Sequence, residues 1–304
     1  MTFATADVED ARPGRDAVRY PAAEKPGRRR LPRALAYVFL VTFSLGMIVP
    51  LLWAAYTSLR PISDTIQHGY FSVARDLTFE NYVHAWTRAD FAPYFANTMI
   101  VLVPSLVAIL VLSSFLGFAL TRFSLRLNLA LLVLFTAGNL LPHQVIIIPL
   151  YHLYLMMPFE MADTYYGVIL IHIAFQLGFC TFVMSSYMKT IPEELTQAAL
   201  VDGASVWRQY WQIILPLCRP PIAALATLQF TWIYNDFFWA LVLQVSAPEK
   251  QPITTALNSL SGVYFTDPNL QAAGALIVAI PNIVVFVLLQ KHFVGGLTLG
   301  ASKG

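Results

Sequence analysis

Charged residues are scarce in this sequence: 12% of its 304 residues are Asp, Glu, Lys or Arg, whereas 57% are hydrophobic. A soluble domain usually carries about 25% charged residues. Most of the charges present here also lie outside the apolar runs. The shortage of charge therefore excludes an ordinary water-soluble domain and indicates a protein whose solvent is the lipid bilayer.

Cysteine is scarce too, and the motifs of catalysis are absent. Cys180 and Cys218 lie in or beside apolar segments without CxxC spacing, which is typical of small buried hydrophobic residues rather than of a redox or metal site. The sequence has no GxxxxGK(S/T) segment to hold nucleotide phosphates, and no HExxH, GxSxG or clustered Cys/His set. We therefore expect no catalytic residue, no metal site and no cofactor bound by this chain itself.

What the sequence does contain is six long apolar runs, each with enough residues for a helix that crosses a bilayer, which takes about 20. They cover residues 34–58, 93–120, 128–153, 167–187, 217–245 and 272–293. We expect an all-α integral membrane protein with six transmembrane helices in residues 34–293. The polar residues 1–33 predict a disordered tail, because they offer too little apolar surface to bury. Residues 294–304 form a second tail.

Lysine and arginine predict the orientation, because cytoplasmic connections carry an excess of these residues. With a cytoplasmic N-terminus, fifteen of the 19 fall on the inner side, and only Arg60, Arg75, Arg88 and Lys250 fall outside. Both termini are therefore predicted to be cytoplasmic. The outer loop 59–92 contains LTFENYVHAW, an amphipathic stretch that predicts a short surface helix, and a short helix is also expected near residues 253–260.

The connection between the fourth and fifth runs, residues 189–216, is too long for a simple turn and too polar to cross the membrane. Thr190 followed by Glu193 predicts a capping box at the start of a helix, and Glu193 and Glu194 complement the positive end of its dipole. This helix is expected to end near Val201, with Gly203 in the left-handed conformation.

A second short helix over residues 206–214 would complete a helix–turn–helix on the cytoplasmic face. Physical chemistry alone leaves open whether it docks on a partner or rests on the membrane interface as an amphipathic helix.

The residues of this connection resemble the EAA loop of ABC importer permeases. The shared pattern is Gln197-Ala198-Ala199, three residues, Gly203-Ala204 and later Ile213-x-Leu215-Pro216. In that family the loop forms a coupling helix that docks in a groove of the cytoplasmic ATPase. The family's Glu is Gln197 here, so one negative charge is missing. The resemblance implies that the ATPase contact includes Glu193, Glu194, Gln197, Ala198, Ala199, Asp202, Gly203 and Ala204.

Two further stretches are similar to permeases of the group that contains the smaller maltose-transporter permease. They are WIYNDFFW at residues 232–239 and the ending QKHFVGGLTLGASKG at residues 290–304. The resemblance implies the type I ABC importer fold and a carbohydrate substrate. In that group the C-terminal tail reaches the ATPases, which implies such a contact for Gly295, Gly296, Leu297, Thr298 and Gly300.

The same resemblance implies a set of partners and a location. The partners are a second permease subunit, forming a heterodimer, two ATP-binding subunits that carry ATP and Mg, and an extracytoplasmic sugar-binding protein. The location is the inner membrane of a bacterial cell. Transport would occur by alternating access, with the loop passing ATPase closure to the spans.

A carboxylate inside a span is costly and marks a candidate functional site. Asp236, which lies beside Asn235 and between Trp232 and Trp239, is a candidate for the substrate pathway, since aromatic faces and polar edges suit sugar rings. The alternative is that Asp236 hydrogen-bonds neighbouring helices or lies near the outer interface. The three intramembrane histidines, His143, His152 and His172, are interpreted as helix-packing residues.

Two other classes of protein are alternatives to the permease. A secondary transporter driven by an ion gradient usually has internal repeats and ionisable groups at the bilayer midplane, whereas this sequence has no convincing repeat and one candidate acid, Asp236. A membrane enzyme or a non-transporting scaffold would need a catalytic constellation or another use for residues 189–216. Both classes fit the sequence less well than the permease.

Overall fold

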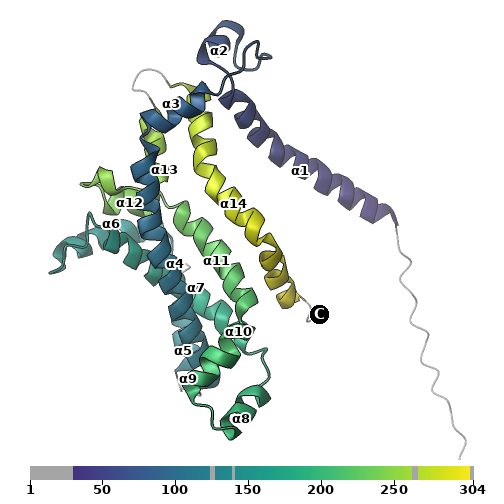
Figure 1. Ribbon diagram of the computed structural model, residues 1–304, viewed down its shortest axis with the longest axis vertical. Coiled ribbons are helices and arrows are strands. Elements are labelled where there is room, and N and C mark those ends of the chain that lie inside the picture. The colour runs from purple at the N-terminus through teal and green to yellow at the C-terminus, as the bar shows by residue number, and fades with distance from the viewer. Residues whose placement is uncertain (1–29, 124–126, 139–140, 262–265, 302–304) are drawn as a thin grey trace, which may run out of the picture. The chain divides into compact units, whose positions relative to one another are not determined.

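The computed structural model describes residues 30–123, 127–138, 141–261 and 266–301 (Figure 1). The chain divides into two compact units, Met1–Val49 and Pro50–Gly304. The described part of the first unit is one stretch of helix α1 (Arg30–Ser58), whose apolar side chains are exposed. A helix that is apolar all round is suited to lipid or to other membrane helices.

The second unit is built from helices, and the described residues contain no strand beyond a single bridge between Ser261 and Thr266. After the end of α1, the helices follow in the order α2 (Ile62–His68), α3 (Glu80–Arg88), α4 (Phe91–Arg122), α5 (Asn128–Gly138), α6 (His143–Met156), α7 (Tyr165–Met188), α8 (Glu194–Val201), α9 (Val206–Gln209), a π-helical turn (Tyr210–Ile214), α10 (Leu215–Leu217), α11 (Arg219–Tyr234), α12 (Phe238–Leu243), α13 (Ile253–Ala256) and α14 (Pro268–Ala301). The expected surface helix in the first loop is α3, and the expected helix near residues 253–260 is α13 with the 3₁₀ turn Leu257–Leu260.

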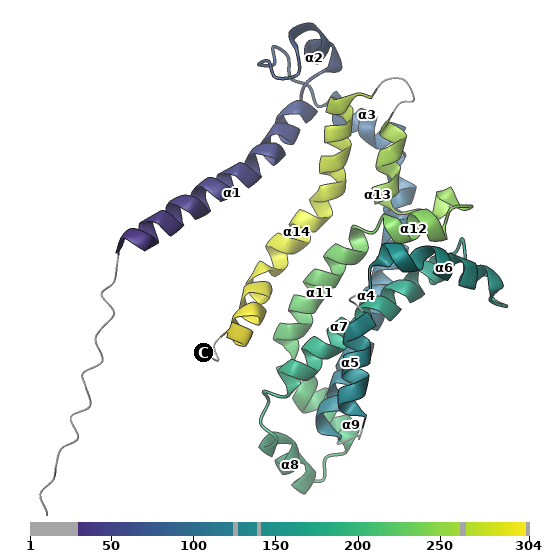
Figure 2. The same ribbon diagram turned by 180° about the vertical axis from the view of Figure 1, so that it is seen from behind.

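The core of this unit is the pair α4 and α7, and α11 packs against both α4 and α14 (Figures 1 and 2). Gly117 allows the close approach of α4 to α7, because a Cβ atom there would lie 2.9 Å from Met184 Cβ and 3.1 Å from the backbone nitrogen of Ser185. Small residues allow this kind of packing in membrane helices. Helices α2 and α3 lie at one end of the unit and α8 at the other.

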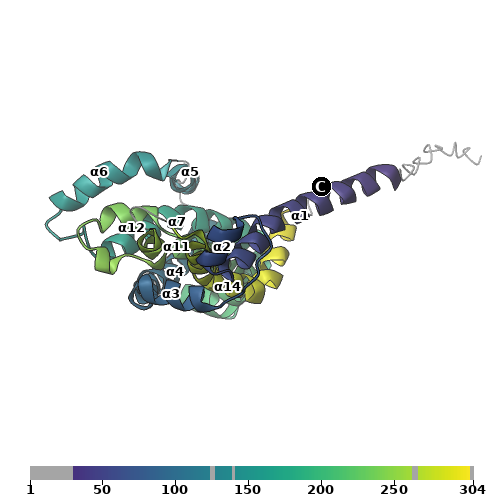
Figure 3. The ribbon, with the colours of Figure 1, turned by 90° about the horizontal axis from the view of Figure 1, so that it is seen from above.

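Four helices in the described residues are long and apolar enough to cross a membrane, and two bent helix pairs raise the number to six. The third apolar run forms two helices, α5 and α6, which meet at 96°. Pro142 precedes α6, and proline disfavours helical conformation in the residue before it. Helix α6 consequently lies with α12 on one side of α4, α7 and α11 (Figure 3).

The fifth apolar run is also interrupted. Helix α11 ends at Tyr234, residues 235–237 are not helical, and α12 begins at Phe238. At its other end α11 is bent by 71° from the preceding helical segment, Val206–Leu217. The sixth span differs in length, since the backbone of α14 remains helical to Ala301 instead of ending near residue 293.

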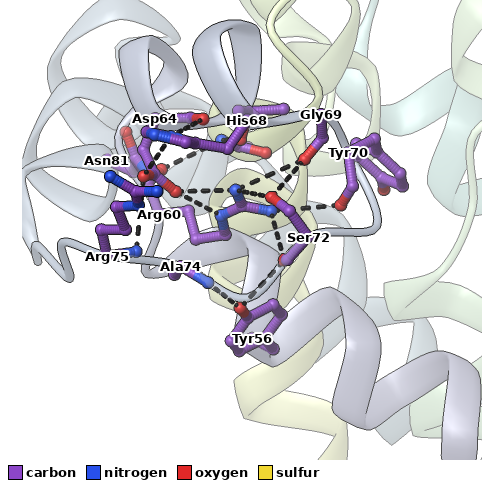
Figure 4. A network of polar contacts seen from close by, with 12 residues as sticks. Tyr56, Arg60, Asp64, His68, Gly69, Tyr70, Ser72, Ala74, Arg75 and Asn81 are labelled. Carbon is purple, nitrogen blue, oxygen red and sulfur yellow. Dashed lines mark hydrogen bonds and ion pairs between the residues drawn. The ribbon is translucent and has the colours of Figure 1, made fainter.

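A buried arginine holds together the end of this unit that carries α2 and α3 (Figure 4). The guanidinium group of Arg60 is completely buried and donates hydrogen bonds to Asp64 Oδ2 at 2.6 and 3.0 Å and to the carbonyl oxygens of Tyr70 and Ser72 at 3.1 and 3.2 Å. The carbonyl oxygen of Arg60 accepts hydrogen bonds from Asn81 on α3 and Asn269 on α14. One residue thus connects α2, its following loop, α3 and α14.

Candidate functional site

The predicted cytoplasmic helix is α8, and its end has the expected geometry. Gly203 has a φ of 75°, and its backbone N–H donates to the carbonyl oxygen of Leu200 at 3.0 Å. The N–H of Ala204 donates to the carbonyl oxygen of Ala199 at 2.8 Å. This pair of bonds is the Schellman motif, which satisfies the last carbonyl groups of a helix. The chain therefore turns sharply after α8.

The start of α8 differs from the prediction, because no capping box forms. The helix begins at Glu194, and Glu193 itself has helical backbone angles without a side-chain capping bond. The hydroxyl group of Thr190 donates instead to the carbonyl oxygen of Tyr187, at the end of α7. A threonine can bond back to the preceding helix as readily as forward to the next one, and here the backward bond is formed.

The residues predicted to contact an ATPase lie mostly on the surface of this connection. Ala199 is buried and Ala204 is half-buried, while the exposed members are Glu193, Glu194, Gln197, Ala198, Asp202 and Gly203. Large apolar side chains are exposed beside them, with Leu200 66% and Val201 88% accessible. Exposed apolar residues grouped with polar ones mark a surface that contacts another protein or a membrane.

The connection is joined to the spans by aromatic packing. After the bond from the Arg208 backbone N–H to Ser205 Oγ, which caps α9, the chain enters the π-helical turn. Tyr210 in that turn stacks on Phe115 of α4 with ring centres 4.5 Å apart, and Trp207 stacks on the same ring at 5.6 Å. Displacement of α8 and α9 would thus act directly on α4. Single π-helical turns occur frequently at functional sites.

The second candidate region is an open pocket of about 510 Å³ beside the break between α11 and α12. All four residues that the sequence predicted for a substrate pathway, Trp232, Asn235, Asp236 and Trp239, line this pocket. It is also lined by His143 of α6 and by three residues of α7, namely His172, Gln176 and Phe179. The helix break thus brings together residues from four helices.

Asp236 occupies the non-helical segment, so the expectation that it lies inside a helix was wrong. Its Oδ1 accepts the backbone N–H of Trp239 at 3.1 Å, in the first turn of α12, and its Oδ2 lies 3.3 Å from His172 Nε2. The side chain is 9% accessible. Asp236 therefore holds α12 to α7, as the alternative interpretation required, and it also forms part of the pocket wall.

Aromatic rings form much of the pocket wall. Trp239 is buried between His143 and Phe175, with ring centres 5.2 and 5.1 Å away. Trp232 contacts Phe179 at 5.7 Å and is 44% accessible, so one of its faces is available. The lining thus includes one buried indole, Trp239, and one exposed indole, Trp232.

Asn235 supplies a polar edge that is fixed by its neighbours. Its Nδ2 donates to the carbonyl oxygen of Thr231 at 2.9 Å, and its Oδ1 accepts from Asn282 of α14 at 2.9 Å. The side chain remains exposed.

Sequence reasoning missed the part that α7 contributes. His172 was interpreted as a packing residue, and Gln176 was given no role, although both line the pocket. A signal was present, because the two polar residues are four positions apart and therefore share one face of a helix. The third histidine of that group, His152, is exposed on α6 away from this lining. No group of three or more metal-ligating side chains occurs in the described part of the chain.

The predicted C-terminal contact lies outside what the structure describes for side chains. Residues 295–300 belong to the last turns of α14, but the positions of their side chains are not described, and residues 302–304 are outside the described ranges.

Comparison with known proteins places the chain in a family. Residues 109–295 match the family described as binding-protein-dependent transport system inner membrane component. The chain is 30% identical over 272 residues to the diacetylchitobiose uptake system permease protein NgcG of Streptomyces coelicolor, covering 89% of both proteins. It is 30% identical over 289 residues to the galactooligosaccharides transport system permease protein GanQ of Bacillus subtilis, covering 93% of this chain and 99% of that protein.

A solved structure has the same fold. It is a chain of a bacterial ABC transporter involved in the import of the acidic polysaccharide alginate, with a TM-score of 0.74 and 22% identity, covering 87% of this chain and 97% of that one. The expected type I importer permease fold is confirmed. The family match also favours the permease over the secondary transporter and the scaffold. The chain therefore belongs to the family of binding-protein-dependent transport system inner membrane components, the multi-pass permease subunits of ABC importers.

Proposed function

We propose that this chain forms one half of the sugar pathway of an ATP-driven importer and that residues 190–216 couple it to ATP hydrolysis. The observation that carries the proposal is the connection from exposed α8 through Tyr210 to Phe115 of α4. A helix that merely rested on a membrane interface would have no need of a stacked joint to the transmembrane core. The importers named for the relatives NgcG and GanQ take up oligosaccharides, which supports a carbohydrate substrate.

The proposed function requires several partner proteins. The sequence has no nucleotide-binding motif, so ATP and Mg belong to two separate ATPase subunits that dock on α8. The pocket beside Asp236 opens on one side of this chain, and a second permease subunit would complete the pathway there. An extracytoplasmic binding protein would deliver the sugar to the end that carries α2 and α3. In this arrangement both termini are cytoplasmic, in agreement with the distribution of lysine and arginine.

The pocket has the chemistry that sugar rings require. The C–H face of a pyranose packs on an aromatic ring, and its hydroxyl groups need polar neighbours at the edge. The exposed face of Trp232 supplies the first and Asn235 the second. The variant Trp232→Ala should lower the rate of sugar uptake at least several-fold, whereas Trp232→Phe, which keeps an aromatic face, should retain most of it. Uptake rates in both variants equal to that of the unmodified protein would mean that Trp232 does not lie on the pathway.

The first experiment is purification of the tagged chain in mild detergent, with identification of its partners by mass spectrometry. We expect a second permease and an ATP-binding subunit. Recovery of the chain alone, with solute uptake into liposomes driven by an ion gradient, would overturn the proposal.

The docking site can be mapped on the same complex. Ala198→Cys with a bifunctional crosslinker should give an adduct with the ATPase, and Val245→Cys, exposed in the loop after α12, should give none. The two native cysteines are buried and free, so their background reaction should be low. An ATPase adduct from Val245→Cys alone would contradict the assignment of α8.

The C-terminal segment has a test of its own. Deletion of Gly295–Gly304 should lower sugar-stimulated ATP hydrolysis or release the ATPase from the complex. Unchanged hydrolysis by the truncated chain would exclude this segment from the mechanism.

A further inference from the structure

The charge of the pocket wall distinguishes it from a site for anions. Its lining contains no lysine and no arginine, and its one acid is Asp236. Recognition of carboxylates and phosphates in proteins depends on cationic or clustered N–H donors, above all on arginine. The described lining presents no lysine or arginine, so a negatively charged sugar would form no ion pair with such a side chain there.

The lining also contains two imidazoles, those of His143 and His172. His172 already contacts the carboxylate group of Asp236 at 3.3 Å, so a proton on His172 would be neutralised there. His143 is packed against Phe175 and Trp239.

We propose that this half of the pathway admits uncharged sugars and excludes anionic ones, such as uronates and sugar phosphates, with Asp236 as the specificity-determining residue. The inference rests on the proposed function, because it requires the pocket to lie on the route of the sugar. The fold itself does not impose this choice, since the structurally similar transporter described above imports an acidic polysaccharide.

The test measures the electrostatic potential of the pocket in the assembled importer, independently of the binding protein. In a background with Cys180→Ala and Cys218→Ala, Thr231→Cys places a thiol in the wall. Its reaction rates with a cationic and an anionic methanethiosulfonate reagent of similar size are each divided by the rates with a free thiol. A full charge nearby should favour the cationic reagent roughly tenfold.

Asp236→Asn should bring this ratio close to one. Asparagine retains an oxygen that can accept the N–H of Trp239, so the start of α12 is preserved. The matched control is Asp76→Asn, which removes the same charge from an exposed position in the outer loop and should leave the ratio unchanged.

The possible outcomes distinguish the exclusion of anions from the position of the pocket on the sugar pathway. An anionic reagent that reacts as fast as the cationic one would overturn the exclusion of anions while leaving the pocket on the pathway. A thiol that reacts with neither reagent, at Thr231→Cys and also at Asn235→Cys, would mean that water does not reach the pocket. That result would overturn both the selectivity and the proposed pathway.

Discussion

The hydroxyl groups of Ser114 and Tyr210 lie 2.6 Å apart in the interior of the protein, and they join helix α4 to the π-helical turn that follows α9. Ser114 also donates to the carbonyl oxygen of Val111 at 2.8 Å, so the Tyr210 hydroxyl group is the donor in the pair. The hydrogen bond lies next to the stacked ring of Phe115. Together the two contacts fix the π-helical turn to α4.

Removal of this hydrogen bond should loosen the coupling. Tyr210→Phe keeps the stacked ring and loses the hydroxyl group, which should cost about 1 kcal/mol of stability and lower the amount of sugar transported per ATP hydrolysed. The ratio is measured in liposomes that contain the whole importer. The control is Tyr166→Phe, which removes a hydroxyl group from an exposed tyrosine near the start of α7. A loss of stability with an unchanged ratio would give Tyr210 a structural role only.

The turn after α8 should depend on backbone conformation at Gly203 rather than on space. A Cβ atom there would meet no atom within 4 Å, but the φ of 75° is left-handed. Gly203→Val should therefore destabilise the loop by about 1–2 kcal/mol and weaken ATPase docking. Gly203→Asn should be mild, because asparagine tolerates this conformation. Co-purification of the ATPase gives the readout, and equal retention by both variants would contradict the argument.

Gly203→Asp separates charge from conformation at the same position. Aspartate also tolerates the left-handed region, so any loss of docking beyond that of Gly203→Asn would come from the added negative charge. The chain should remain inserted in the membrane. Normal transport by this variant would count against a coupling role for the loop.

Close packing of α4 on α7 predicts a steric effect at Gly117. An added methyl group would press on Met184 Cβ and on backbone, neither of which is the free end of a flexible side chain. Gly117→Ala should destabilise the protein by about 1–3 kcal/mol, measured as a lower melting temperature in detergent. Gly138→Ala is the control, since a Cβ atom there meets nothing within 4 Å. Similar melting temperatures for the two variants would show that the helices separate easily.

The buried Arg60–Asp64 pair predicts that the stability of the end carrying α2 and α3 depends on pH. The hydrogen bond from the Arg60 guanidinium group lowers the pKa of Asp64, and the N–H of Arg75 and the charge of His68 act in the same direction. A lowered pKa means that the pair stabilises the folded state above the ordinary value, which is about 4, and that this contribution is lost as the pH falls through the folded value.

This dependence is measured by comparison with Asp64→Asn. The melting temperature of the variant should lie below that of the unmodified protein at neutral pH, and the two should converge as the pH falls from about 4 through the lowered pKa of Asp64. A gap that stays constant as the pH falls would mean that the carboxylate charge contributes nothing to this end of the protein.

Local signals in the sequence predicted the end of α8 correctly and its beginning incorrectly. Gly203 predicts its own left-handed conformation because no other residue adopts it at so little cost. The predicted capping box does not form, because the Thr190 hydroxyl group donates to the carbonyl oxygen of Tyr187 at the end of α7. Which bond a threonine forms at such a position depends on how the preceding helix ends. The motif therefore predicts that the threonine side chain forms a hydrogen bond, but it does not predict which of the two neighbouring helices supplies the partner.

Hydropathy located the apolar runs, but it does not place the breaks within them. The runs at residues 128–153 and 217–245 are apolar throughout much of their length, which is all that hydropathy measures. The actual breaks lie at Gly138–His143 and at residues 235–237. Proline marks the first, but Pro149 lies inside α6 without ending it, so proline alone could not identify the position.

The sequence by itself determined that this protein is a helical membrane protein and that a helix between α7 and α11 ends at a left-handed Gly203, because the length of an apolar run and the conformational preference of a glycine are local properties. Only the tertiary structure decided the pocket. His172 and Asp236 are 64 positions apart and meet because α11 ends before Asp236 and α12 turns back toward α7. No local preference specifies that meeting, since it depends on the packing of helices that are distant in the chain.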